Sequence, residues 1–298
     1  MSIVPEEVSE NIDLLPAEEQ RQVLKLLEAY EGALKREEAQ SSYLGFVKHM
    51  WPAFIQGRHH KVMAEAFERI SRGELKRLII NMPPRHTKSE FASYLLPAWF
   101  LGQYPDKKII QTAHTAELSV GFGRKVRNLV DSEDFKNVFP KLALRADSKA
   151  AGRWSTNAGG EYFAIGVGGA VTGKGADLLI IDDPHSEQEG QSADPSVFDR
   201  TYDWYTSGPR QRLQPGGAIV IVMTRWHMRD LTGKIIKASA QRQGSDEWEV
   251  IEFPAIMPSG NALWPEFWSI EELNSLQSEL PAPKWNAQYQ QNPTAEEG

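Results

Sequence analysis

From residue 77 onward, the chain alternates short apolar runs rich in β-branched residues with longer amphipathic segments. The runs are RLIINM (77–82), KKIIQTA (107–113), EYFAIGV (161–167), DLLIIDD (177–183), AIVIVMT (218–224) and WEVIEFP (248–254). Continuous apolar strands separated by helices are typical of parallel sheets that are covered on both faces. The pattern therefore predicts an α/β fold with a mainly parallel central sheet flanked by helices on both faces.

The flanking regions differ from this central pattern. Residues 1–45 are polar and acidic with helical periodicity, which predicts an N-terminal helical segment. Four leucines form one apolar stripe on it, and the simplest interpretation is that the helix packs on the main domain: Leu24, Leu26, Leu27 and Leu34. We expect the main domain to span residues 46–280. Residues 281–298 are rich in Pro, Gln and Asn, which indicates a linker.

Composition excludes several classes of protein. The 298 residues include 41% hydrophobic and 24% charged positions, as in a soluble globular protein, and no cysteine, which excludes disulfides and thiolate zinc sites. No apolar run approaches the roughly 20 residues that a membrane span needs. The net charge of −7 argues against a generally basic surface, although a local basic track remains compatible with it. The histidines have no metal-ligand spacing.

The stretch RLIINMPPRHTKSEF (77–91) has the spacing of a phosphate-binding loop between a strand and a helix. Met82 and Thr87 occupy the positions where such loops carry glycine, so an ordinary strand–turn–helix stays a possible interpretation. We expect Lys88 to contact the outer phosphates and the Ser89 hydroxyl to bind Mg²⁺. Six residues are expected to contact the nucleotide: Pro84, Arg85, His86, Thr87, Lys88 and Ser89.

The helix after this loop, KSEFASYLL, is followed by Pro97, which we expect to kink or end it. Prolines 83 and 84 have no N–H to donate, and they push Met82 toward an extended backbone. The amides of residues 85–89 must therefore build the phosphate cradle. Arg85 adds a second cation facing the same anion.

A second candidate site follows the apolar strand in GADLLIIDDPHSE (175–187). Asp182 would hold Mg²⁺ through water, and Asp183 would polarise the attacking water as a general base. Paired aspartates are also common in plain turns, but the phosphate-like loop in the same α/β pattern favours a nucleotide site. We expect Lys88 and Asp182 to converge on one triphosphate–metal pocket at adjacent strand ends.

Two further segments each leave two interpretations open. The glycine-dense AIGVGGAVTGKGAD (164–177), with Lys174 in its middle, predicts either a mobile loop near the nucleotide or DNA, or a flexible hairpin. In AIVIVMTRWHMRDL (218–231), Thr224 ends a strand and is placed to sense the γ-phosphate. The alternative is a helix cap formed by Thr224 or Asp230.

Five motifs together resemble the large terminase subunit of tailed bacteriophages, the ATP-driven motors that package DNA into capsids. They are NMPPRHTKSE, GKGADLLIIDDP, DWYTSGPRQRL, IVMTRWHMRDL and WNAQYQQNP, and the similarity covers most of residues 45–293. The resemblance implies a P-loop NTPase of the ASCE type. Its variant Walker A loop corresponds to Arg85, Lys88 and Ser89, its Walker B aspartate to Asp182, and its coupling motif to Thr224.

The resemblance also leaves parts of the site open. The family usually has glutamate where this chain has Asp183, and its adenine-contacting segment lies upstream of the loop, near Gln56 and GRHH (57–60). The transition-state arginine would be Arg85 in cis, or one of four candidates from a neighbouring subunit: Arg124, Arg127, Arg210 and Arg212.

The family further implies ATP and Mg²⁺ as cofactors and the host cytoplasm as location. The implied partners are double-stranded DNA, the portal protein of the procapsid, the small terminase subunit and further copies in a pentameric ring. A C-terminal nuclease domain would begin beyond QYQQNP, so we expect this chain to be the ATPase half and not to cleave DNA. Two other functions stay open: a helicase-like P-loop ATPase, and a degenerate nucleotide-binding module that serves interactions.

Overall fold

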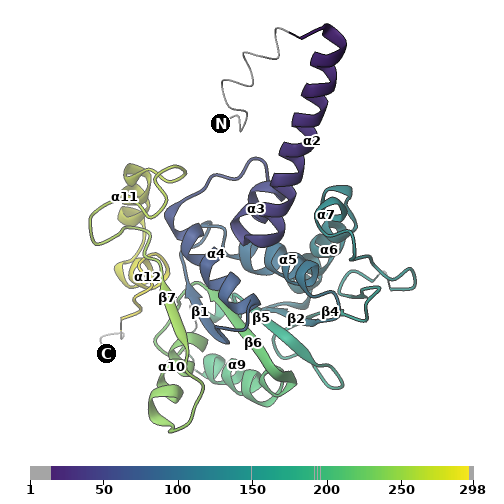
Figure 1. Cartoon of the computed structure of the whole chain (residues 1–298). Coiled ribbons are helices and arrows are strands. Elements are labelled where there is room, and N and C mark those ends of the chain that lie inside the picture. Colours follow the sequence, from purple (N-terminus) through teal and green to yellow (C-terminus); the bar gives the residue numbers. More distant parts are fainter. Residues whose placement is uncertain (1–14, 149, 191, 193, 195, 295–298) are drawn as a thin grey trace.

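A computed structural model describes residues 15–148, 150–190, 192, 194 and 196–294 (Figure 1). Within them, seven strands form one sheet in the order β3-β4-β2-β5-β6-β1-β7. In chain order these are β1 (Arg77–Asn81), β2 (Lys108–Ala113), β3 (Arg153–Ser155), β4 (Glu161–Gly166), β5 (Ala176–Asp182), β6 (Leu213–Met223) and β7 (Glu249–Glu252). All neighbours pair in parallel except β3, which is antiparallel to β4.

The six apolar runs are all strands of this sheet, which confirms the predicted fold class. Of the described strands, β3 alone was not expected, because its three residues contain a single apolar side chain, Trp154. Within the described residues no helix is both long and apolar enough to span a membrane.

Helices precede, connect and follow the strands. The N-terminal ones are α2 (Ala17–Ser41), α3 (Tyr43–Met50) and α4 (Arg58–Ser71). The π-helix η1 (Glu90–Leu95) and α5 (Leu96–Gln103) follow β1, and α6 (Ala116–Asp131) and α7 (Glu133–Val138) follow β2. Between β5 and β6 lie α8 (Glu187–Gly190), α9 (Ser196–Ser207) and the short η2 (Pro209–Arg212). The last helices are α10 (Leu231–Gln241), α11 (Ile270–Glu279) and α12 (Ala282–Gln288).

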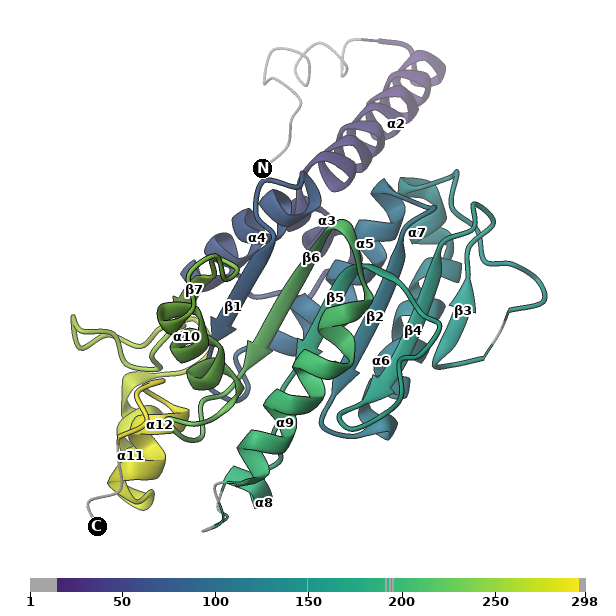
Figure 2. The same ribbon diagram turned by 90° about the horizontal axis from the view of Figure 1, so that it is seen from below.

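Two apolar cores cover the two faces of the sheet. Successive side chains of a strand point to opposite faces, so in β1 Leu78 and Ile80 enter one core while Ile79 enters the other. The larger core contains α3, α4, η1, α5 and α6, and the smaller one contains α9 and α10 (Figures 1 and 2). Strands buried on both sides explain why the apolar runs are continuous.

Of the two outcomes expected at Pro97, an end of the helix is wrong, because the helical run that follows the phosphate-like loop continues through the proline. The turn before it is a π-helix, in which the Leu96 N–H donates to the Phe91 carbonyl, and Pro97 then lies in the first turn of α5. A proline is tolerated in the first turn because its missing N–H needs no partner there. The wider π turn therefore lets one helical run pass through the proline.

The helix α2 does not pack along the main domain, which corrects the simplest interpretation of its leucine stripe. It projects from the body, and its carboxyl-terminal end is the anchored part (Figures 1 and 2). There Ala39 is buried, and its carbonyl accepts a hydrogen bond from the Trp99 indole. Leu24 and Leu26 remain 50% and 69% exposed. Residues 1–14 of the expected helical segment lie outside the described residues.

The glycine-dense segment is neither a hairpin nor, at Lys174, close to the phosphate-like loop. Strands β4 and β5 both run parallel to β2, which lies between them. Residues 167–175 therefore form a crossover that passes β2 and returns the chain from the carboxyl end of β4 to the amino end of β5. Lys174 pairs with Glu161 at 3.0 Å, at the start of β4. It therefore lies at the amino end of the strands, whereas the loop after β1 lies at their carboxyl end.

The segment expected to be a linker is largely folded. Residues 282–288 form α12, where the Trp285 side chain is buried in a small core with Ala255 and Leu273. The Tyr289 carbonyl accepts a hydrogen bond from the Ala255 N–H at 2.6 Å. Polar composition suggested a linker, but two aromatic side chains at i and i+4, Trp285 and Tyr289, are enough to dock this short helix. Residues 295–298 lie outside the described residues.

A buried tyrosine ties α3 to the π turn, and its removal gives a test of the packing. The Tyr43 hydroxyl is fully buried and donates a 2.6 Å hydrogen bond to the Phe91 carbonyl. We expect Tyr43→Phe to lower the free energy of unfolding by about 1 kcal/mol, because the carbonyl keeps its bond from the Leu96 N–H. Urea denaturation followed by circular dichroism measures this change. Tyr30→Phe, at a 58% exposed position, is the matched control and should have no effect.

Candidate nucleotide-binding site

The loop after β1 has a left-handed backbone at two residues that carry a side chain. Arg85 and Thr87 have φ values of +61° and +68°, in the left-handed region that side chains with a Cβ rarely enter. This conformation costs roughly 1–2 kcal/mol per residue. Thr87, at the position where the sequence predicted a missing glycine, therefore has a φ value that glycine adopts at lower cost. Met82 is buried, and its N–H donates to the Met223 carbonyl.

Buried contacts hold the loop from below. His86 is 1% exposed, its Nδ1 lies 2.8 Å from the Pro84 carbonyl, and its ring stacks on Trp268 with centroids 6.1 Å apart. Burial lowers the pKa of His86 to about 4, so the ring is neutral at physiological pH. His86 therefore supports the loop through its ring and offers the nucleotide only backbone groups. Arg85, in contrast, is exposed.

The loop and the end of β5 converge, as the sequence predicted. The Lys88 Nζ lies 2.9 Å from a carboxylate oxygen of Asp183. The Ser89 hydroxyl donates a 3.0 Å hydrogen bond to Asp182, and Ser93 donates a 2.7 Å bond to the other oxygen of that carboxylate. Lys88 and Asp182 are 6% and 2% exposed. One ammonium, two hydroxyls and two carboxylates thus lie together in this part of the structure.

The two strands that carry these groups are not neighbours, which corrects one detail of the expectation. β6 lies between β1 and β5, and Val222 of β6 pairs with Asp182 in register while Met223 pairs with Asn81. All three strands therefore end at the same level. A strand between the loop and the carboxylates widens the site by one inter-strand spacing, about 5 Å. This spacing gives the Lys88 side chain room to extend toward Asp183.

Asp182 is a buried carboxylate beside a second carboxylate. Burial, followed by the negative charge of Asp183, raises the pKa of Asp182 to about 7, although Lys88 and the two serine hydroxyls act in the opposite direction. A divalent cation would favour the ionised carboxylate. Carboxylate and hydroxyl oxygens fit Mg²⁺, which takes one or two protein ligands and fills the rest of its shell with water and phosphate oxygens. Among the described residues no cluster of three His, Asp or Glu side chains forms an all-protein metal site.

Thr224 lies at the end of β6 and links the two sides of the site. Its N–H donates a 2.8 Å hydrogen bond to Asp183, and its hydroxyl donates a 3.2 Å bond to the Met82 carbonyl. Thr224 therefore does not cap a helix. Asp230 does: its carboxylate accepts from the Gly233 N–H at the start of α10 and also pairs with the buried Arg225 at 2.9 Å. Sequence alone left both residues as possible caps.

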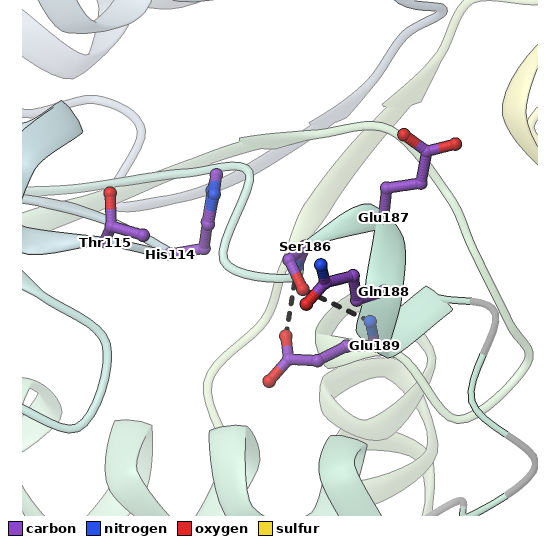
Figure 3. A pocket seen from close by; sticks show the side chains of 6 residues that line it. All are labelled: His114, Thr115, Ser186, Glu187, Gln188 and Glu189. Atoms are coloured by element: carbon purple, nitrogen blue, oxygen red, sulfur yellow. Dashed lines mark hydrogen bonds between the residues drawn. The ribbon is translucent and has the colours of Figure 1, made fainter.

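Two hollows adjoin these groups. One, of about 650 Å³, lies between the ends of β2 and β5 (Figure 3). It is lined by His114, Thr115, Ser186, Glu187, Gln188 and Glu189. Ser186 and Glu189 exchange hydrogen bonds there, the Ser186 N–H donating to the Glu189 carboxylate and the Glu189 N–H to the Ser186 hydroxyl. This hollow is polar and negatively charged.

The second hollow, of about 250 Å³, lies on the other side of the loop and is mainly apolar. Its lining comes from three segments: Trp51, Ala53 and Ile55 before α4, Arg85, Thr87 and Glu90 of the loop, and Trp264 and Phe267 after β7. Gln56 follows the first of these segments but is not among the lining residues. The aromatic residues after β7 were missed by sequence reasoning, because nothing in their local pattern links them to a loop about 180 residues earlier.

The remaining arginine candidates occupy different places. Arg124 is exposed on α6. Arg210 and Arg212 are in η2, which leads into the amino end of β6, opposite the loop. There Arg210 pairs with Asp246 at 2.8 Å, and Asp246 also pairs with Arg77 at 2.9 Å. Neither Arg210 nor Arg212 can therefore reach the site of its own subunit.

Comparisons with known proteins were made by sequence and by structure. No protein-family model and no curated protein matches the sequence. The large terminase of bacteriophage HK97 matches in structure over 81% of this chain and 52% of its own, with 14% identity and a TM-score of 0.52. A mutant of the large terminase ATPase domain of Thermus phage P74-26 matches over 77% of this chain and 93% of its own, with 16% identity and a TM-score of 0.49.

The large terminase of the thermophilic bacteriophage D6E, in complex with ATP-gamma-S, matches over 76% of this chain and 50% of its own, with 9% identity and a TM-score of 0.47. This chain thus spans about half the length of the HK97 protein. At these identities the likeness concerns the path of the backbone. Over most of its length the chain has the fold of the HK97 large terminase, a P-loop α/β fold whose sequence signature was already present in the phosphate-binding loop and the paired aspartates.

Proposed function

We propose that this chain is the ATP-hydrolysing motor domain of a viral DNA-packaging terminase, which moves double-stranded DNA into a procapsid. The observation that carries the proposal is the convergence of Lys88, Ser89 and the paired aspartates at the carboxyl end of the sheet. Ligands of α/β sheets bind outside the carboxyl ends of the strands. The shared fold with a large terminase and the five sequence motifs support the same function.

In this proposal each side chain has one task. Lys88, together with Arg85 and the amides of the loop, binds the phosphates, because the loop opens a helix whose amino end favours anions. Ser89 and Asp182 would hold Mg²⁺, which supplies charge neutralisation on the phosphates when it is bound. Asp183 is the general base that orients and deprotonates the attacking water. The Thr224 N–H bonds Asp183 to the end of β6, so a movement of the Asp183 carboxylate would be transmitted to that strand.

The Lys88–Asp183 ion pair has a consequence for the order of events. The Lys88 ammonium pairs with the carboxylate of Asp183, the proposed base, at 2.9 Å. A triphosphate competes for the ammonium, since its charge is larger and its oxygens are several. Asp183 is then free to accept a proton from water. The base therefore becomes active only when the substrate has bound.

The nucleobase is proposed to occupy the apolar hollow beside the loop. That hollow borders Arg85 and Thr87 and contains the aromatic rings of Trp51, Trp264 and Phe267, which suit a planar base. This hollow is close to the upstream segment that the resemblance indicated. Its lining comes from residues 51–55, however, and not from Gln56, His59 or His60. His59 and His60 are buried beneath the loop.

Two other functions differ in what they require. A degenerate interaction module was suggested by the missing glycines, but Thr87 holds the left-handed conformation that such a glycine supplies, which removes that motive. A helicase-like ATPase would use the same pocket, so activity on DNA must separate it from a packaging motor. Portal protein, procapsid, small subunit, nuclease domain and a pentameric ring belong to the proposed packaging function.

The first test removes the phosphate contact and the metal ligand. We expect Lys88→Ala and Asp182→Asn each to lower the rate of phosphate release from ATP and Mg²⁺ by about 100-fold or more, because each removes a preorganised charge. Lys136→Ala, which removes exposed contacts with the carboxylate and the carbonyl of Asp131, is the control and should hydrolyse ATP normally. Unchanged hydrolysis in the two site variants would exclude both enzyme functions.

The second test separates the base from binding. Asp183→Asn keeps the acceptor for the Thr224 N–H but cannot take a proton, so hydrolysis should fall by roughly 100- to 10,000-fold. Binding of a fluorescent ATP analogue should persist. Asp183→Glu should retain part of the activity, since it keeps a carboxylate. Asp147→Asn, an exposed position, serves as the matched control. A fully active Asp183→Asn protein would show that another group is the base.

The third test distinguishes packaging from strand separation. Blunt double-stranded DNA should stimulate the ATPase without sequence preference, and the stimulation should fall as salt rises, because phosphate contacts dominate such binding. Addition of procapsids with portal protein should increase it further. Unwinding of a forked duplex, measured by strand release, would instead support a helicase.

A further inference from the structure

A histidine buried beneath the phosphate-binding loop contacts the residue that replaces its glycine. His60 lies in the first turn of α4 and is fully buried. Its Nε2 is 2.7 Å from the hydroxyl oxygen of Thr87. Thr87 is the residue whose φ of +68° departs most from what its side chain prefers within the loop. The contact joins two segments that are 27 residues apart in the chain.

The direction of this hydrogen bond follows from the other side of the ring. The Gly57 N–H donates to His60 Nδ1 at 2.8 Å, so that nitrogen carries no proton. Burial and the nearby His59 and His86 lower the pKa of His60 to about 2, which keeps the ring neutral. The single ring proton is then on Nε2 and is donated to Thr87. The Thr87 hydroxyl in turn donates to the His86 carbonyl at 2.5 Å.

Both ends of this chain of hydrogen bonds are fixed by packing. The His60 ring stacks on Phe91 with centroids 4.8 Å apart and meets the edges of Phe54 and Trp264 at 4.7 and 5.1 Å. Gly57 must lack a side chain, because a Cβ there would lie 2.6 Å from the Trp264 ring. The donor to Nδ1, the ring and the acceptor hydroxyl therefore have little freedom to move.

We infer that His60 is a positioning residue of the nucleotide site, which holds Thr87 in the left-handed conformation that a glycine would reach without help. This inference rests on the proposed nucleotide binding at the same loop. His60 does not touch the nucleotide; it acts through Thr87, whose backbone sets the direction of the following amides and of Lys88. The loop thus replaces the freedom of a glycine by a buried hydrogen bond from a second helix.

The test uses two substitutions alone and together. His60→Ala should weaken the binding of a fluorescent ADP analogue with Mg²⁺ by roughly 3- to 10-fold, as for one lost hydrogen bond. Thr87→Gly in that background should restore the affinity to near the wild-type value, because glycine needs no support at this φ. His60→Gln should also retain affinity, since its amide can donate to Thr87. Both rescues would be absent if His60 only filled space.

Met63→Ala is the matched control for loss of packing. Met63 is on the same helix, is fully buried and makes no hydrogen bond to the loop. It should lower the melting temperature without changing nucleotide affinity. If His60→Ala binds like wild type, or if His60→Ala with Thr87→Gly, folded by circular dichroism, stays as weak as His60→Ala, the inference is overturned.

A second measurement needs no nucleotide and so separates this inference from the proposed function. Amide hydrogen exchange of residues 85–90 should become faster in His60→Ala than in wild type, while His60→Gln should exchange like wild type. Equal exchange in His60→Ala and wild type would overturn the role of His60 even if ATP binds. Failure of the wild-type protein to bind any nucleotide would instead overturn the proposed function, and the exchange result would still decide whether His60 holds the loop.

Discussion

The ion pair between Lys88 and Asp183, 2.9 Å long, is the contact on which the interpretation of the site depends. It joins the loop after β1 to the end of β5 across the intervening β6. A second contact between the same two segments, the hydrogen bond from the Ser89 hydroxyl to Asp182, joins residues that are 93 positions apart in the sequence. Bringing like-charged carboxylates together in a buried corner is unfavourable, and it is tolerated here because an ammonium and two hydroxyls face them. Such an arrangement fits a site that takes up a metal and a polyanion.

The loop after β1 shows how a left-handed backbone can be held at residues other than glycine. Left-handed angles at Arg85 and Thr87 carry a conformational cost, and the protein offsets it with buried contacts in place of backbone freedom. His86 and His60 are both buried and neutral, so their role in the loop is structural support through hydrogen bonds.

The carboxyl-terminal segment completes the environment of β6. The Arg225 N–H donates to the Gln291 side chain, and the Arg225 guanidinium pairs with Asp230 and, at 3.5 Å, with Glu252. Lys284 of α12 pairs with Glu187 of α8 at 3.3 Å. The strand end that carries Thr224 is therefore connected to the helices after β7.

The amino-acid sequence by itself determined the sheet strands and the two halves of the site. Strands that are buried on both faces appear in the sequence as continuous apolar runs. Asp182-Asp183 ends one such run, and Lys88-Ser89 follows another after a short loop. Boundaries were less certain: β6 begins five residues before its apolar run. The π turn before Pro97 was not predicted, and the polar tail was misjudged, since the docking of Trp285 depends on partners distant in sequence.

Only the tertiary structure decided how the loop without glycine is held and what surrounds it. The strand order, the support of Thr87 by His60 and the aromatic wall after β7 all arise from pairs of segments far apart in the chain. A local pattern carries no information on such pairs, because the same residues are compatible with many registers and crossovers. Packing chooses among them by burying apolar faces and leaving buried polar groups paired.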